Sequence, residues 1–244
     1  STAKSIALYE QILTEPTSNY TELAAIRASR YFYNNGNYAK AIPYYERTVQ
    51  ATSDPEVIFN AESGLMRSYF QTKDYVPAAA SAKNVLKSGL LKTENKLEAQ
   101  YIVGVSCYNN KEYADALTAL SFVSRNTTKA IASEAQFLIA SCYFEQDKLK
   151  DADKQAQQVL KMKPTYDYWI AKALILQTKI QMKNNDLFQA EQTILSVIQQ
   201  YPEENDGIKQ EAQVVYDELM QIKNMPKSTV VPTEATEVEI NGGK

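Results

Sequence analysis

The sequence predicts an all-α solenoid of antiparallel helix pairs stacked one after another, and three observations support this fold class. From Asn19 to Asn224, apolar residues recur at three- and four-residue intervals, which is typical of amphipathic helices. Gly and Pro stand mainly where such helices should end. A short pattern ending in Ala occurs five times, with its Ala at positions 41, 78, 116, 152 and 190, so the spacings are 37, 38, 36 and 38 residues. Near-equal spacings of this length indicate a repeat array of five units.

Composition excludes several kinds of chemistry. The 244 residues include 2 Cys and no His, so the chain has no imidazole base, no Ser–His or Cys–His pair and too few thiols for a Cys-only zinc site. The net charge of -3 and the pI of about 5.3 provide no basic field for nucleic acid. The apolar runs are too short to span a bilayer. We therefore expect no catalytic residue, no metal, no cofactor, no nucleic-acid partner and no membrane-spanning segment.

Each unit contains two amphipathic segments. The first is rich in Ala and aromatic residues and follows a polar cap, of which Asp54 before Pro55 is the best formed. The second begins near the polar residue that precedes the recurrent aromatic residue or Leu, and Asp74 and Asp186 are its best caps. The expected caps of the later first segments are Thr93, Thr128 and Asp167.

Two small or cyclic side chains affect how the segments pack. The recurrent Ala lies where the two helices of a unit should cross, and a larger side chain there would overpack the crossing at a cost of roughly 1–3 kcal/mol. Pro43 lies about six residues into a second helix, where Pro removes a backbone hydrogen bond. We expect a kink or a late helix start at Pro43.

The units resemble the tetratricopeptide repeat family. The resemblance rests on Ile139, Ala140, Tyr143, Ala152, Ala156, Val159 and Pro164 in the fourth unit, on Val103, Gly104 and Ala116 in the third, and on Phe32, Ala41 and Tyr45 in the first. No unit keeps the family's leading Trp, and the units exceed the usual length of about 34 residues. The resemblance implies a right-handed superhelical solenoid whose concave side is lined by the first helix of each pair.

The long period is similar to that of bacterial cell-envelope members of this family. Examples are outer-membrane assembly lipoproteins and coordinators associated with the Tol–Pal system. The resemblance favours the periplasm or cell envelope of a Gram-negative bacterium as the location, with the cytoplasm as the alternative.

Four parts are expected along the chain. Residues 1–16 form an N-terminal helix, which either caps the array or is the remnant of a preceding repeat in a longer protein; we favour the remnant. Residues 19–204 form the five repeats, and residues 205–224 form a C-terminal capping helix. Residues 225–244 read as a flexible tail by composition. A segment that docks in a groove of this or another chain is the alternative for the tail.

The implied concave side is aromatic in its middle and basic at its ends. Its aromatic and apolar rows contain one residue from each unit, and basic residues lie between the rows. The predicted partner-binding residues are Arg30, Tyr33, Arg67, Phe70, Tyr101, Tyr108, Phe137, Phe144, Lys179 and Met182. Two alternatives stay open: the aromatic residues pack between neighbouring units, and the arginines are either solvated or paired with an acidic partner.

The predicted function is a non-catalytic protein–protein interaction scaffold that binds a peptide or helix of a partner in its concave groove. Ile26 and Arg30 occupy positions where the chaperone-binding branch of the family holds a terminal carboxylate with Lys and Asn, so that clamp is not assembled. The alternative function is a structural or self-associating module that stacks through its terminal helices, and the oligomeric state is left open. Cys107 and Cys142 are expected to be buried free thiols.

Overall fold

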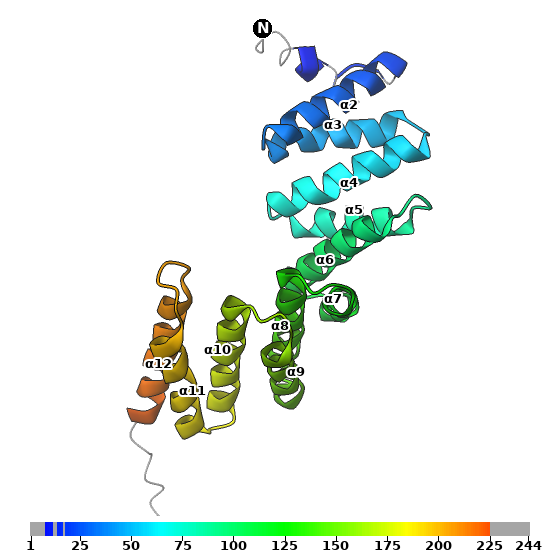
Figure 1. Cartoon of the computed structure of the whole chain (residues 1–244). Coiled ribbons are helices and arrows are strands. Elements are labelled where there is room, and N and C mark those ends of the chain that lie inside the picture. Colours follow the sequence, from blue (N-terminus) through cyan, green and yellow to red (C-terminus); the bar gives the residue numbers. More distant parts are fainter. Residues whose placement is uncertain (1–7, 12–13, 17, 225–244) are drawn as a thin grey trace, which may run out of the picture.

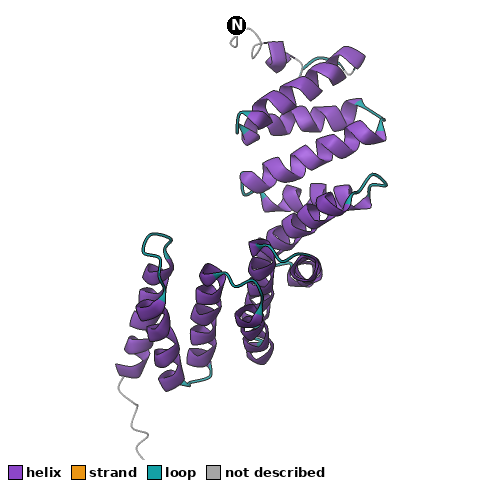
Figure 2. Ribbon diagram, viewed as in Figure 1, coloured by secondary structure: helices purple, strands orange, loops and turns teal. Residues whose placement is uncertain are grey.

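The computed structural model describes residues 8–11, 14–16 and 18–224, and this part of the chain is helical apart from its turns (Figures 1 and 2). The named helices are α2 (Asn19–Asn34), α3 (Tyr38–Ala51), α4 (Pro55–Gln71), α5 (Tyr75–Lys87), α6 (Thr93–Asn109), α7 (Tyr113–Asn126), α8 (Ala130–Glu145), α9 (Leu149–Lys161), α10 (Asp167–Lys183), α11 (Leu187–Gln200) and α12 (Ile208–Asn224). Within the described ranges no β-strand occurs. The predicted all-α solenoid of helix pairs is confirmed.

The helices form five antiparallel pairs, which we call units 1 to 5, and α12 follows the fifth pair. We call α2, α4, α6, α8 and α10 the first helices and α3, α5, α7, α9 and α11 the second helices. Every helix packs against the next one along the chain, and consecutive first helices also contact one another. In the described part of the chain, consecutive second helices make no such contact. The first helices therefore form the inner layer of a stack whose helix axes rotate from unit to unit (Figure 1).

The same backbone turn joins the two helices of every unit. Its central residue has a positive φ in all five units, at Gly36 (72°), Lys73 (61°), Lys111 (64°), Asp147 (58°) and Asn185 (59°). In unit 1, the amide of Asn37 donates to the carbonyl of Phe32 and the amide of Gly36 donates to that of Tyr33, and the other four turns repeat this pattern. This is the Schellman arrangement that ends a helix. The recurrent polar pair of the sequence pattern therefore encodes a helix stop and a reversal of direction.

The predicted helix caps are confirmed only in part. The Asp54 side chain accepts hydrogen bonds from the amides of Glu56 and Val57, and Pro55 opens α4. Asp186 accepts from the amide of Gln189, whereas Asp74 stands at the cap position of α5 without a side-chain hydrogen bond.

The prediction of Thr93, Thr128 and Asp167 as caps was wrong. Helices α6, α8 and α10 begin directly after Lys92, Lys129 and Tyr166, whose backbones are extended and whose side chains form no cap hydrogen bond. A cap residue is defined by its extended backbone. In these three helices the residue with that backbone has a side chain that does not cap the helix.

Two further predictions concern the helix with Pro43 and the chain ends. Helix α3 begins at Tyr38 and continues through Pro43, so a late start was wrong. The predicted tail, residues 225–244, and most of the predicted N-terminal helix lie outside the described residues. Among the helices that are described, none combines the length and apolar character needed to cross a membrane.

Small residues bring the two helices of each unit together. Ala41, Ala78, Ala116, Ala152 and Ala190 are fully buried. A Cβ at Gly104 in α6 would lie 2.6 Å from Cδ2 of Leu120 and 3.2 Å from the backbone nitrogen of Leu120 in α7. Helices α6 and α7 are therefore as close as a glycine allows.

We expect Gly104→Ala to lower the free energy of unfolding. The added methyl group must displace Leu120, at a cost of roughly 1–3 kcal/mol, which outweighs the gain of about 1 kcal/mol in helix propensity. Urea denaturation followed by circular dichroism measures the change. Gly89→Ala is the control, because a Cβ at Gly89 meets nothing within 4 Å. Equal stability of Gly104→Ala and the wild type would show that α6 and α7 do not need this close approach.

Candidate functional site

The inner layer contains a pocket of about 240 Å³ between α6, α8 and α10, with α12 at its edge. Aromatic and apolar side chains form most of its wall. Four charged side chains complete it: Glu145 from α8, Lys172 and Lys179 from α10, and Glu211 from α12. Its lining residues are Tyr108, Phe137, Leu138, Ser141, Phe144, Glu145, Lys172, Ile175, Leu176, Lys179 and Glu211. Four of the ten predicted partner-binding residues, Tyr108, Phe137, Phe144 and Lys179, therefore meet at one pocket, which we call the aromatic pocket.

Two of the four charged side chains that line the aromatic pocket, Lys172 and Glu211, are paired with each other. Lys172 Nζ lies 2.7 Å from Glu211 Oε2 and 5.6 Å from the centre of the Phe137 ring. Lys183 covers the Phe144 ring at 4.8 Å and pairs with Asp147 at 2.8 Å. Within the described residues Lys179 forms no ion pair. Among the described residues that line the aromatic pocket, Lys179 is thus the cation without an ion pair.

One wall of the aromatic pocket is supported by the only Trp of the chain. The Phe137 and Trp169 rings lie 5.7 Å apart between centres, and Tyr168 packs edge-on against Trp169. Burial raises the pKa of Tyr108, and the nearby carboxylate of Glu145 raises it further. The Tyr108 hydroxyl is therefore a neutral hydrogen-bonding group at neutral pH.

The predicted aromatic residues of units 1 to 3 are held against other side chains. Tyr33 packs edge-on against Tyr38 and Tyr45. Phe70 and Tyr101 pack against each other at 5.9 Å, and burial followed by the charge of Glu134 raises the pKa of Tyr101. These residues pack within the chain while remaining partly exposed. Met182 likewise packs against the apolar cluster of α10, α11 and α12.

The two predicted arginines differ in their surroundings. Arg67 forms a two-pronged ion pair with Glu98, with Nε 2.6 Å from Oε1 and Nη2 2.5 Å from Oε2, and Glu98 raises the pKa of Arg67. The guanidinium of Arg67 is therefore paired within the chain, although its side chain stays partly exposed. Arg30 is exposed and lines a second hollow of about 180 Å³ between α2, α3 and α4.

Sequence reasoning missed two ion-pair partners, Glu98 for Arg67 and Glu211 for Lys172. Both act across a boundary between units, which a comparison of positions within one unit does not reveal. A signal was present seven residues before the row of Arg30 and Arg67, where Asn60, Glu98, Glu134 and Lys172 recur at one residue per unit.

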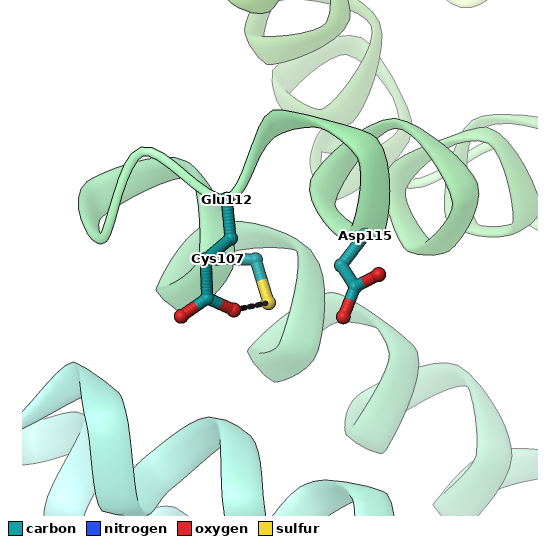
Figure 3. A group of neighbouring side chains, drawn as sticks. All are labelled: Cys107, Glu112 and Asp115. Atoms are coloured by element: carbon teal, nitrogen blue, oxygen red, sulfur yellow. Dashed lines mark hydrogen bonds between the residues drawn. The ribbon is translucent and has the colours of Figure 1, made fainter.

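Cys107 and Cys142 are buried free thiols, as predicted. Figure 3 shows Cys107 donating a hydrogen bond to Glu112 at 3.4 Å, with Asp115 close by. This group is the single one in the described part of the chain whose Cys, Asp or Glu ligand atoms lie close enough to share a metal, within 4.8 Å. Asp115 is paired with Lys83 at 2.5 Å, and burial raises the pKa of Cys107 to about 12. A protonated thiol and a neutralised carboxylate give no support for a metal site.

Comparisons with known families identify two matching models. The model described as anaphase-promoting complex, cyclosome, subunit 3 matches residues 34–123, and the tetratricopeptide repeat model matches residues 134–165. No curated protein matches the chain in sequence.

Solved structures of similar fold include two helical repeat proteins. MamA from Desulfovibrio magneticus RS-1 (residues 41 to the end) has 18% identity and a TM-score of 0.56, and the alignment covers 75% of this chain and 96% of that one. YrrB, described as a TPR protein with an unusual peptide-binding site, has 16% identity and a TM-score of 0.59, with 78% and 91% coverage. At these identities the similarity establishes the fold alone.

Both thiols should resist alkylation in the folded protein. Burial raises the pKa of Cys107 and of Cys142 to about 12, whereas an unfolded thiol has a pKa of about 8.5. At pH 8, iodoacetamide should leave both thiols unmodified in buffer and alkylate both in urea, as mass spectrometry can measure. Rapid alkylation of either thiol in buffer would contradict the burial.

The same pKa shifts predict how stability depends on pH. Above pH 8.5 the folded state keeps thiol protons that the unfolded state releases. The contribution of the two thiols to the free energy of unfolding is therefore complete below about pH 8.5 and is lost as the pH rises toward 12. The free energy of unfolding should therefore fall above pH 8.5, and it should fall less steeply in Cys142→Ala than in the wild type.

Proposed function

Because the chain belongs to the tetratricopeptide repeat family, we propose that it is a non-catalytic scaffold that binds a peptide or helix of a partner protein on its inner layer. The aromatic pocket carries this proposal, since it is a hollow of about 240 Å³ at which side chains from three consecutive units meet. A segment of a partner that follows the inner layer would place one of its side chains there.

The chemistry of the aromatic pocket suits an apolar side chain with polar neighbours. Tyr108, Phe137 and Phe144 supply aromatic surface, and such anchors in a concave surface dominate binding energy. Lys179 on one wall and Glu145 on another can fix the orientation of a peptide by hydrogen bonds. The similar fold of YrrB, which is described as having a peptide-binding site, supports the same use of this architecture.

Catalysis is not part of the proposal. The chain has no His, and its two thiols are buried with raised pKa values, so they remain protonated at neutral pH. The acidic residues at the aromatic pocket include Glu211, which is neutralised by Lys172. The charged side chains at the aromatic pocket supply hydrogen bonds and charge for recognition.

Self-association is the second candidate function, and one observation favours it. At the outer face of unit 1, Leu8, Tyr20 and Leu23 are 61%, 87% and 49% exposed. They surround a hollow of about 480 Å³ that also includes Tyr9 and Arg27. Large exposed apolar side chains that gather on one face are typical of a protein contact surface, so this face suits contact with another chain.

Removing aromatic surface from the aromatic pocket should weaken peptide binding. A displayed library of random 12-residue peptides can be selected on the wild type, and the affinity of a selected peptide can be measured by fluorescence anisotropy. Tyr108→Ala combined with Phe144→Ala should raise the dissociation constant by roughly 30-fold or more, because an anchor side chain contributes about 2 kcal/mol or more.

The control for that experiment is Phe188→Ala, because Phe188 is an aromatic residue of α11 that is 70% exposed and lies outside the aromatic pocket. It should leave binding unchanged. Unchanged affinity in the double variant, with intact helicity and cooperative unfolding, would overturn binding at the aromatic pocket.

Polar substitutions at the outer face of unit 1 test self-association. If the chain stacks through this face, light scattering after size exclusion should show a mass that rises with concentration, and Tyr20→Ser combined with Leu23→Ser should abolish the rise. Val76→Ser is the control, since Val76 is 66% exposed on α5. A constant monomer mass for the wild type would remove this candidate.

A further inference from the structure

Arg30 and Arg67 hold the same position in units 1 and 2. They are 37 residues apart, which is also the distance from Ala41 to Ala78 in the recurrent pattern. The residues that face them from the next first helix also correspond. Asn60 in α4 and Glu98 in α6 are 38 residues apart, as are Ala78 and Ala116. The boundary between α4 and α6 is therefore an internal template for the boundary between α2 and α4.

At the template boundary, the carboxylate of Glu98 in α6 pairs with the guanidinium of Arg67 in α4. Both oxygens of Glu98 contact Arg67, at 2.6 and 2.5 Å, with side-chain exposures of 37% for Glu98 and 31% for Arg67. The planar fork of a guanidinium matches two carboxylate oxygens, and such two-pronged bonds are among the strongest in proteins.

At the corresponding boundary of unit 1, the carboxylate is missing. Asn60 replaces it, and Arg30 forms no ion pair with any residue that the structure describes. Instead there is a hollow of about 180 Å³, whose wall includes Ile26, Ser29, Arg30, Tyr45 and Asn60. We call this hollow the Arg30 pocket. Burial raises the pKa of Tyr45, and the positive charges of Arg30 and Arg67 both oppose this rise, so both arginines act on the same small volume.

We propose that the Arg30 pocket binds the side-chain carboxylate of an Asp or Glu in the partner segment, in the place relative to Arg30 that Glu98 takes relative to Arg67. This inference rests on the proposed function, because it names the partner chemistry at a second point of the same inner layer. Arg30 supplies the charge, the amide of Asn60 supplies a further donor, and Ile26 contacts the methylene groups. The charge is complementary, since the Arg67–Glu98 pair next to the pocket is neutral and Arg30 is left with a positive charge.

The spacing of the two pockets limits the partner further. The Arg30 pocket lies between α2 and α4, and the aromatic pocket is lined by α6, α8 and α10, so two to three helix spacings separate them along the inner layer. With roughly 8–10 Å for each spacing and about 3.3 Å for each extended residue, about five to nine residues separate them. A partner segment of about 12 residues with an acidic side chain near one end and an apolar one near the other would reach both.

The test uses a displayed library of random 12-residue peptides whose two ends are both joined to the display protein, so that no free terminal carboxylate is present. The wild type should enrich Asp or Glu at one position by threefold or more over the unselected library. A selected peptide, titrated by fluorescence anisotropy, should bind roughly tenfold more weakly when that residue is replaced by its amide.

Matched variants locate this effect at the Arg30 pocket. Asn60→Glu recreates the template pair inside the chain, so it should abolish the acidic preference, whereas Asn60→Gln should keep it. Arg30→Gln should also abolish it, and Arg30 is an exposed side chain whose loss leaves the core unchanged. Glu98→Gln frees Arg67, so it should add a second preferred acidic position.

The outcomes separate this inference from the proposed function. If selected peptides depend on Tyr108 and Phe144 but show no acidic preference, or if Asn60→Glu leaves that preference intact, the Arg30 pocket does not bind a carboxylate and the aromatic pocket stands. If the wild type enriches no peptide, the proposed function itself fails. An acidic preference lost in Asn60→Glu and in Arg30→Gln but kept in Asn60→Gln supports the inference.

Discussion

The close approach of the two helices in each unit is the constraint on which the rest of the structure depends. Ala41, Ala78, Ala116, Ala152 and Ala190 are fully buried, and Gly104 of α6 leaves no room for a Cβ next to Leu120 of α7. Because the crossing is tight, each pair behaves as one rigid block that buries little apolar surface alone and must stack on its neighbours. The regular stacking then places one residue from every unit in each row of the inner layer.

The turn between the two helices has the same backbone geometry in every unit, while the side chains of the inner layer differ from unit to unit. All five turns have one residue in the left-handed conformation and the same pair of backbone hydrogen bonds, although a side chain other than Gly costs roughly 1–2 kcal/mol in this conformation. Since the backbone repeats, chemical differences along the inner layer come from side chains alone. Ion pairs form at the boundaries next to Arg67 and Lys172, whereas Arg30 and Lys179 form none with the residues that the structure describes.

The period and the buried Ala positions were predictable from the sequence, because both follow from contacts within one unit. The caps at Thr93, Thr128 and Asp167 were not, since the start of each of those helices is set by the extended backbone of Lys92, Lys129 or Tyr166. The candidate site was predicted as rows, and the structure gathers four of its residues at one pocket. The pairing of Arg67 with Glu98 depends on the rotation between units, which no single unit encodes.

Consecutive units contact one another mainly through the second helix of one unit and the first helix of the next, and also through their first helices, whereas the described second helices do not contact one another across units. A stack of this kind can deform at its unit boundaries while each helix stays intact. A pull on the two ends would be shared among several similar boundaries, each yielding by a small rotation, so the chain could lengthen without breaking any helix. Because every boundary can yield a little, the curvature of the inner surface can change in small steps without any change within a helix.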